Sequence, residues 1–177
     1  MKILHGQQHP PDEHASGTLA IPNPAAAQPV IRVIRREPVK GIYQLTTFNQ
    51  PAQIQQAFKA LTRFANTRGL PLKGLTGILA PLQRNTYKAF LPLRDAPPQS
   101  SPFPISEIKG GTFATFTVCG DLKQTKKAAH YFLHRWLPAN GYKIAGVAGF
   151  ETFTEDPTAA PYLQLQRQIH IPIEPAL

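Results

Sequence analysis

The pattern of apolar and polar positions changes period several times along the chain, and the changes occur in the same order twice. Between residues 51 and 68 apolar residues recur every three or four positions, which predicts a helix with one buried face. Pro51 suits the first turn of this helix and Gly69 its end. The same spacing predicts a second helix over residues 122–137, capped by Asp121. The residues expected inside are Ile54, Ala57, Phe58, Leu61, Phe64 and Ala65 in the first helix and Leu122, Ala129, Phe132, Leu133, Trp136 and Leu137 in the second.

Strand-like segments flank both predicted helices. Residues 30–37, 41–48, 75–80 and 86–93 surround the first, and residues 104–108, 111–118, 147–153 and 163–173 surround the second. We expect segment 41–48 to be the hairpin partner of segment 30–37, across a turn at Pro38. Each half therefore reads strand, strand, helix, strand, strand.

The two halves are related as an internal repeat. We predict repeat one over residues 30–94, a proline-rich linker over 95–103 and repeat two over 104–177. The predicted fold class is α+β: a single domain of two ββαββ units with pseudo-twofold symmetry. Two helices would cover one face of the antiparallel strands, and a groove between the halves would open on the other. The matched glycines are Gly41 with Gly111, Gly69 with Gly141, Gly74 with Gly146 and Gly77 with Gly149.

Residues 1–29 have no counterpart in the repeat. The segment is rich in proline with small and polar residues between, so it buries too little apolar surface to offset its ordering entropy. We predict a flexible arm. It is too short and proline-rich to hold a helix-turn-helix, so we expect no DNA-binding domain.

Composition narrows the class of protein. The 177 residues are 42% hydrophobic and 16% charged, as in a globular protein, and the net charge of +9 is spread along the chain rather than gathered in basic runs. Cys119 is the only cysteine, which makes the cytoplasm the default location, and no apolar run is long enough to cross a membrane. His130 and His134 have a spacing seen in zinc sites, but a third ligand is missing, so we expect no metal and no cofactor.

Five short stretches of the second half carry a family resemblance. GGTFATF at 110–116, WLPANGY at 136–142, FETF at 150–153, EDP at 155–157 and IHIPI at 169–173 occur in the order and approximate spacing seen in the gyrase-inhibitor-like small-molecule-binding domain. This is the effector-binding domain of AraC-type and MerR-type regulators, and the resemblance spans about residues 30–175. It implies two related halves with an aromatic-lined cleft at their interface. In many members of the family one buried acid in that cleft selects cations.

The chain departs from the family at this acid. The usual position in the last strand is Gln168, and its equivalent in the first repeat is Lys88, so we expect a neutral or anionic ligand. Two readings of Glu151 stay open: it faces the cleft and replaces the missing acid, or it is a surface carboxylate. The candidate ligand-binding residues are Tyr43, Lys88, Phe113, Trp136, Tyr142, Glu151 and Gln168.

Three functions follow from the resemblance. The first is a binding protein that senses or sequesters a lipophilic or aromatic small molecule. The second is a hydrolase that opens reactive small molecules in the same cleft with an acid and aromatic hydroxyls, for which Glu151 or Glu107 would have to serve. The third is a modulator of a protein partner, as in gyrase binding. We assign no catalytic residue, and fold analogy alone does not decide among the three.

Overall fold

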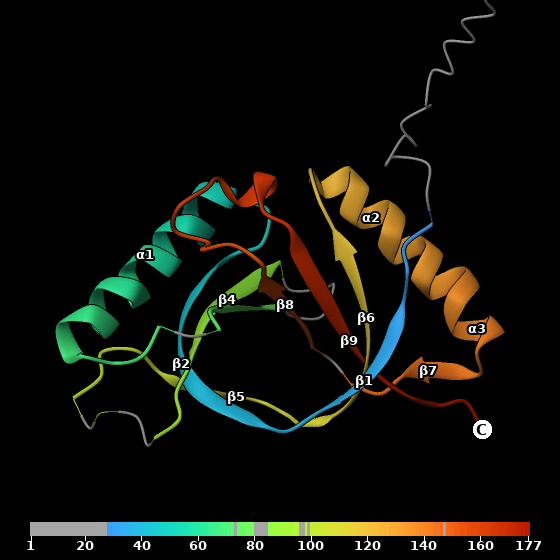
Figure 1. Cartoon of the computed structure of the whole chain (residues 1–177), viewed down its shortest axis with the longest axis horizontal. Coiled ribbons are helices and arrows are strands. Elements are labelled where there is room, and N and C mark those ends of the chain that lie inside the picture. The colour runs from blue at the N-terminus through green and yellow to red at the C-terminus, as the bar shows by residue number, and fades with distance from the viewer. Residues whose placement is uncertain (1–27, 73, 80–84, 96–97, 99, 147) are drawn as a thin grey trace, which may run out of the picture.

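In the computed structural model, a sheet of nine strands carries the helices α1 and α2 on one of its faces (Figure 1). The count refers to the residues that the structure describes, namely 28–72, 74–79, 85–95, 98, 100–146 and 148–177. The strands are β1 Arg32–Arg36, β2 Val39–Thr47, β3 Thr76–Leu79, β4 Thr86–Pro92, β5 Ile105–Ile108, β6 Gly111–Val118, β7 Tyr142–Ile144, β8 Gly149–Phe153 and β9 Arg167–Pro175. The helices are α1 Pro51–Arg68, α2 Leu122–Tyr131, the π-helix η1 Phe132–Trp136, α3 Leu137–Ala139 and the 3-10 turn η2 Tyr162–Gln164.

The sheet is antiparallel throughout, in the order β1-β6-β9-β8-β3-β4-β2-β5, with β7 paired to β9. The α+β class predicted from the sequence is therefore confirmed. The predicted arm falls almost wholly outside the described residues.

The first strand of each half pairs with the other half. β1 pairs with β6, and β5 pairs with β2, so the predicted hairpin between segments 30–37 and 41–48 is wrong. Two residues, Glu37 and Pro38, connect β1 to β2. A two-residue hairpin turn requires a positive φ, and proline fixes φ near −65°. Neither residue has a positive φ, and the chain continues forward into the neighbouring half instead of folding back.

The two halves meet where β3 pairs with β8. In this pair Gly77 lies opposite Glu151, and Leu79 lies opposite Gly149. The repeat alignment that matches Gly77 with Gly149 also matches Leu79 with Glu151. Exchanging the two halves therefore turns the Gly77–Glu151 pair into the Gly149–Leu79 pair, and the β3–β8 pairing is unchanged. Glu151 therefore occupies the place in the second half that Leu79 occupies in the first.

Helix α1 begins and ends where the sequence predicts. Pro51 is in its first turn, and Gly69 caps it with a φ of 63°, a left-handed conformation that costs glycine little. The predicted inner face is buried at Ile54, Ala57, Phe58, Leu61 and Ala65, and Phe64 is partly buried.

The second helix starts as predicted but widens before its end. The Asp121 carboxylate accepts a hydrogen bond from the Gln124 amide at 3.0 Å. Across η1 the Leu137 amide donates to the Phe132 carbonyl, a π-helical step. Pro138 follows at once, and proline cannot donate to a carbonyl four residues back, which explains the wider turn. None of the helices in the described part of the chain is long and apolar enough to span a membrane.

Both sheet faces are packed. On the helix face, one apolar core lies under α1 and a second under η1, and Leu79 contacts both. On the opposite face Ile78, Phe90, Phe113 and Phe150 form a third core, against which parts of β1, β2 and β5 pack as these strands curve beneath the sheet (Figure 1). This third core therefore occupies the described centre of the face on which the groove was expected. β1 and β5 lie on this face because each of them pairs with a strand of the other half.

His170 packs against this third core, on the sheet face opposite the helices. Its ring is fully buried, stacks on Phe150 with centroids 4.4 Å apart, and has Nε2 3.1 Å from the Thr152 hydroxyl oxygen. Nδ1 has no hydrogen-bond partner among the residues that the structure describes. Burial, and to a smaller degree the positive charge of Arg36, lower the pKa of His170 from 6.5 to about 3.

This histidine should make the fold sensitive to acid. As pH falls from 6.5 towards 3, the unfolded chain binds a proton at His170 and the folded chain does not. The free energy of unfolding then falls by up to about 1.4 kcal/mol per pH unit from this group. We expect His170→Gln to lose less stability than the parent between pH 6.5 and pH 4.5, measured by urea unfolding at both values. Equal losses in the two proteins would show that His170 is not held neutral.

Candidate functional site

Glu151 lies in the centre of the sheet and is shielded from water. Only 1% of its surface is exposed, and it lies on the same side of β8 as Phe153, which packs into the core under α1. The second reading of Glu151, a surface carboxylate, is therefore wrong. The chain does have a buried acid at the junction of its two halves, on the helix side of the sheet.

Two tyrosine hydroxyls hold the Glu151 carboxylate. Tyr87 and Tyr162 both donate to Oε1, at 2.6 and 2.7 Å. Tyr87 comes from β4 in the first half, so its hydroxyl reaches Glu151 across the intervening strand β3. Gly77 makes this possible, because a Cβ atom there would lie 1.8 Å from the Tyr87 hydroxyl oxygen. Because Gly77 has no side chain, a hydrogen bond between the two halves can pass through the space beside it.

Arg167 brings a positive charge to the same cluster. The side chain is fully buried, with Nη1 4.0 Å from Glu151 Oε2 and 3.1 Å from the Tyr162 hydroxyl. Its guanidinium carbon lies 4.8 Å from the centroid of the Tyr162 ring. Nη2 donates to the Gly120 carbonyl and to the Thr125 hydroxyl, both at 2.9 Å. Arg167 therefore connects the buried acid to the first turn of α2.

Burial dominates the electrostatics of this cluster. It raises the pKa of the Glu151 carboxyl, although hydrogen bonds from both tyrosines and the charge of Arg167 act in the opposite direction. Burial and the neighbouring Glu151 charge raise the pKa values of Tyr87 and Tyr162 well above 10.0. Both phenols therefore stay protonated at neutral pH and act as hydrogen-bond donors. Chemically, the cluster can bind a polar group or exchange a proton at the Glu151 carboxyl.

Four of the other predicted ligand residues lie on the opposite sheet face. Tyr43, Lys88, Phe113 and Gln168 alternate with neighbours that pack under the helices, so their side chains point away from Glu151. The Lys88 ammonium lies 4.5 Å from the centroid of the Tyr43 ring and 3.4 Å from the Ser106 hydroxyl oxygen. The structure therefore does not bring these four residues together with the buried acid.

Lys88 and Gln168 are also not equivalent to one another. Lys88 pairs with Ile78, and the repeat matches Ile78 with Phe150, whose partner is His170. Gln168 pairs with Thr152, two positions further along β8, so His170 and not Gln168 is the equivalent of Lys88. The alignment of the two repeats is out of register at Lys88 and Gln168, because the loops before β4 and β9 differ in length.

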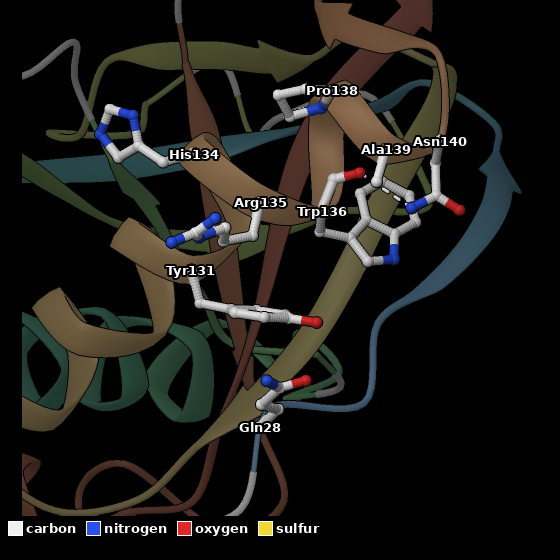
Figure 2. A pocket seen from close by; sticks show the side chains of 8 residues that line it. All are labelled: Gln28, Tyr131, His134, Arg135, Trp136, Pro138, Ala139 and Asn140. Carbon is white, nitrogen blue, oxygen red and sulfur yellow. Dashed lines mark hydrogen bonds between the residues drawn. The ribbon is translucent and has the colours of Figure 1, made fainter.

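Trp136 and Tyr142 form a separate aromatic group at the end of the second helix. Their rings stack with centroids 5.8 Å apart and planes 3° from parallel. Trp136 also lines an open hollow of about 870 Å³, shown in Figure 2, where the Asn140 side-chain amide donates to the Trp136 carbonyl at 2.8 Å. The hollow is lined by Gln28, Tyr131, His134, Arg135, Trp136, Pro138, Ala139 and Asn140, none of which belongs to the Glu151 cluster.

The His130 and His134 rings lie 4.4 Å apart, centroid to centroid. In the described residues no three His, Cys, Asp or Glu side chains are placed to hold a metal ion. Asp156 is exposed and accepts two hydrogen bonds from Thr158, so it has the role of a turn carboxylate.

Sequence reasoning missed three members of the cluster: Tyr87, Tyr162 and Arg167. One signal was present, because Arg167 precedes Ile169 and Ile171 at a spacing of two, which places a charged residue on an apolar strand face. Nothing local connects Tyr87 with Glu151, since they are separated by 64 positions. Tyr162 reaches the cluster from the connection between β8 and β9.

The structure is an α+β domain with a buried acid where its two halves meet. The family model of the GyrI-like small molecule binding domain matches residues 27–174, and the chain belongs to this family. A comparison with curated proteins found no match.

Solved structures of similar fold include the EcmrR C-terminal domain, which is 12% identical, with a TM-score of 0.59 over 84% of this chain and 99% of that one. A hydrolase from Listeria innocua is 10% identical, with a TM-score of 0.56 over 84% of this chain and 94% of that one. SAV2435 bound to tetraphenylphosphonium is 12% identical, with a TM-score of 0.50 over 82% and 94%. At these identities the likeness concerns the fold alone.

The close approach of Tyr87 to Gly77 gives a direct test of the cluster. We expect Gly77→Ala to lower the free energy of unfolding by about 2 kcal/mol or more, because the new methyl group displaces the Tyr87 hydroxyl from Glu151. Gly146→Ala is the matched control, since its Cβ would lie 3.4 Å from Pro172 Cγ, an ordinary contact. Denaturant unfolding of both variants measures the difference. If Gly77→Ala were as stable as the control, the Tyr87 hydroxyl would not occupy this passage.

Proposed function

We propose that the chain is a small-molecule-binding protein that senses or sequesters a lipophilic, aromatic ligand between its two halves, next to Glu151. The single observation that carries this proposal is the buried cluster of Glu151, Tyr87, Tyr162 and Arg167. The family model, which describes a small molecule binding domain, supports the same reading.

The cluster is costly for the fold. A buried ion pair usually contributes less stability than apolar residues of similar volume. The fold itself does not require an acid at this place, because the matching position in the first half is Leu79, which packs against both cores of the helix face. Strained or costly polar groups in a buried position are candidates for function. We therefore assign Glu151 to ligand recognition.

Aromatic side chains surround the acid. Tyr87 and Tyr162 pack edge to face at 6.1 Å, and Phe153 and Phe58 pack edge to face at 5.3 Å beside them. Most small-molecule sites combine such apolar walls with a few polar groups that fix orientation. This composition suits a flat aromatic ligand that makes one or two hydrogen bonds.

Tyr162 is the side chain that a ligand would displace. It lies on η2 in the connection between β8 and β9, and this connection is held to α1 by a hydrogen bond from the Gln55 amide to the Ala160 carbonyl at 3.0 Å. Outward movement of η2 would free one of the two hydrogen bonds at Glu151 Oε1 for a ligand. The cytoplasmic location indicated by the lone cysteine is part of this proposal.

Hydrolysis is a second candidate function, and one observation favours it. A carboxyl group with a raised pKa lies within hydrogen-bond distance of two protonated phenols, a set that can donate and accept protons. Incubation with a ring-strained electrophile, followed by mass analysis for added water, separates the two functions. Catalytic turnover that is lost in Glu151→Gln would favour hydrolysis over binding.

The binding proposal is tested by calorimetric titration with neutral, anionic and cationic aromatic compounds. For the compound that binds, we expect Tyr87→Phe and Glu151→Gln each to weaken binding about tenfold or more, since each removes a hydrogen bond that involves a charged acceptor. Tyr142→Phe is the matched control, because it removes a phenol hydroxyl outside the cluster and keeps the ring that stacks on Trp136. Loss of binding in the control but not in the cluster variants would place the site at the Trp136–Tyr142 pair. No binding by the folded parent to any compound would contradict the proposal.

A further inference from the structure

We infer that Arg167 determines the charge preference of this site: its guanidinium takes the place beside Glu151 that a ligand cation would need, so that the site accepts uncharged ligands. This inference rests on the proposed function and assigns its ligand class. The Arg167 guanidinium thus supplies the positive charge beside the buried Glu151 carboxylate.

The position of Arg167 resembles that of a bound cation. Its guanidinium lies over the face of the Tyr162 ring and beside Glu151, with a fully buried side chain. A carboxylate and an aromatic face are the two groups that stabilise a desolvated cation. Here a residue of β9 makes both contacts, before any ligand is present.

Arg167 is also fixed in this position. Its Nη2 donates to the Gly120 carbonyl and the Thr125 hydroxyl, which lie before and within the first turn of α2. A ligand cation would have to break these bonds to replace the guanidinium, or else share one carboxylate with it. Two buried cations beside one carboxylate leave an unpaired charge in a medium of low dielectric, which is costly.

An anionic ligand is disfavoured by Glu151 itself. A neutral ligand leaves the Glu151–Arg167 pair balanced, its acceptor oxygen can take the hydrogen bond that Arg167 Nη1 donates to Tyr162, and Tyr87 keeps its own hydrogen bond to Glu151. One donor is available to it, because Arg167 Nε is buried and has no hydrogen-bond partner in the part of the chain that the structure describes. The inferred ligand is therefore an uncharged aromatic molecule with a hydrogen-bond acceptor such as a carbonyl or phosphoryl oxygen.

The test uses two probes of similar shape and different charge. Triphenylphosphine oxide is neutral and has an acceptor oxygen, and tetraphenylphosphonium is a cation. We expect the full-length parent to bind the neutral probe about tenfold or more tightly than the cation by calorimetry. In Arg167→Met, which removes the charge and keeps an unbranched apolar chain, the cation should bind about tenfold or more tightly than in the parent. The double variant Arg167→Met/Glu151→Gln should lose that gain.

Gln168→Glu is the matched control. It adds an acid one residue from Arg167 on the opposite sheet face, so it should leave the affinity for the cation at the parent level. Thermal melting establishes that each variant is folded, and Arg167→Gln replaces Arg167→Met if the latter is not. The ratio of the two affinities in the parent tests the inference without any variant.

The outcomes separate this inference from the function on which it rests. If the parent binds the cation as tightly as the neutral probe, or if the folded Arg167 variants bind the neutral probe but gain nothing for the cation, Arg167 does not set the preference. The proposed function survives both results. If no folded protein in the series binds either probe, nor any compound of the wider panel, the proposed function and the inference fail together.

Discussion

A carboxylate that is removed from water must find its hydrogen bonds and its counter-charge within the protein, and the centre of this molecule is arranged around that requirement. Glu151 accepts one hydrogen bond from each half. Tyr87 on β4 donates from the first half, and Tyr162 on the β8–β9 connection donates from the second. Arg167 supplies the counter-charge. Gly77 has no side chain where the Tyr87 hydroxyl passes. The joint between the halves is therefore held by polar contacts as well as by the apolar packing of Leu79.

The helices and their ends could be predicted from the sequence because their signals are local. Pro51, Gly69 and Asp121 act within one helical turn, and the apolar faces are read from a spacing of three and four residues. Strand pairing is not local. The pairing of β1 with β6 depends on whether the chain turns at Glu37 and Pro38, and the absence of glycine, asparagine or aspartate at these two positions argued against a hairpin.

Only part of the candidate site could be predicted from the sequence. Glu151 was identified as a candidate, but alternation along a short strand does not say which face is buried, so both readings stayed open. Lys88 was matched with Gln168 for another reason: the strand pairs make His170, two residues further along β9, the equivalent of Lys88, and a shift of two residues leaves the alternation of strand faces unchanged. Tyr87 and Arg167 join Glu151 only through the tertiary fold, from strands that flank the junction.

The central claim is that a ligand binds at the junction around Glu151. A crystal structure of the protein grown with triphenylphosphine oxide tests it most directly. The account predicts the compound beside Glu151 and Tyr87, its oxygen accepting a hydrogen bond from Arg167 Nε, with Tyr162 displaced and the Glu151–Arg167 pair kept. A compound bound at the Trp136 hollow or on the opposite sheet face, with the four residues of the cluster unchanged, would contradict it.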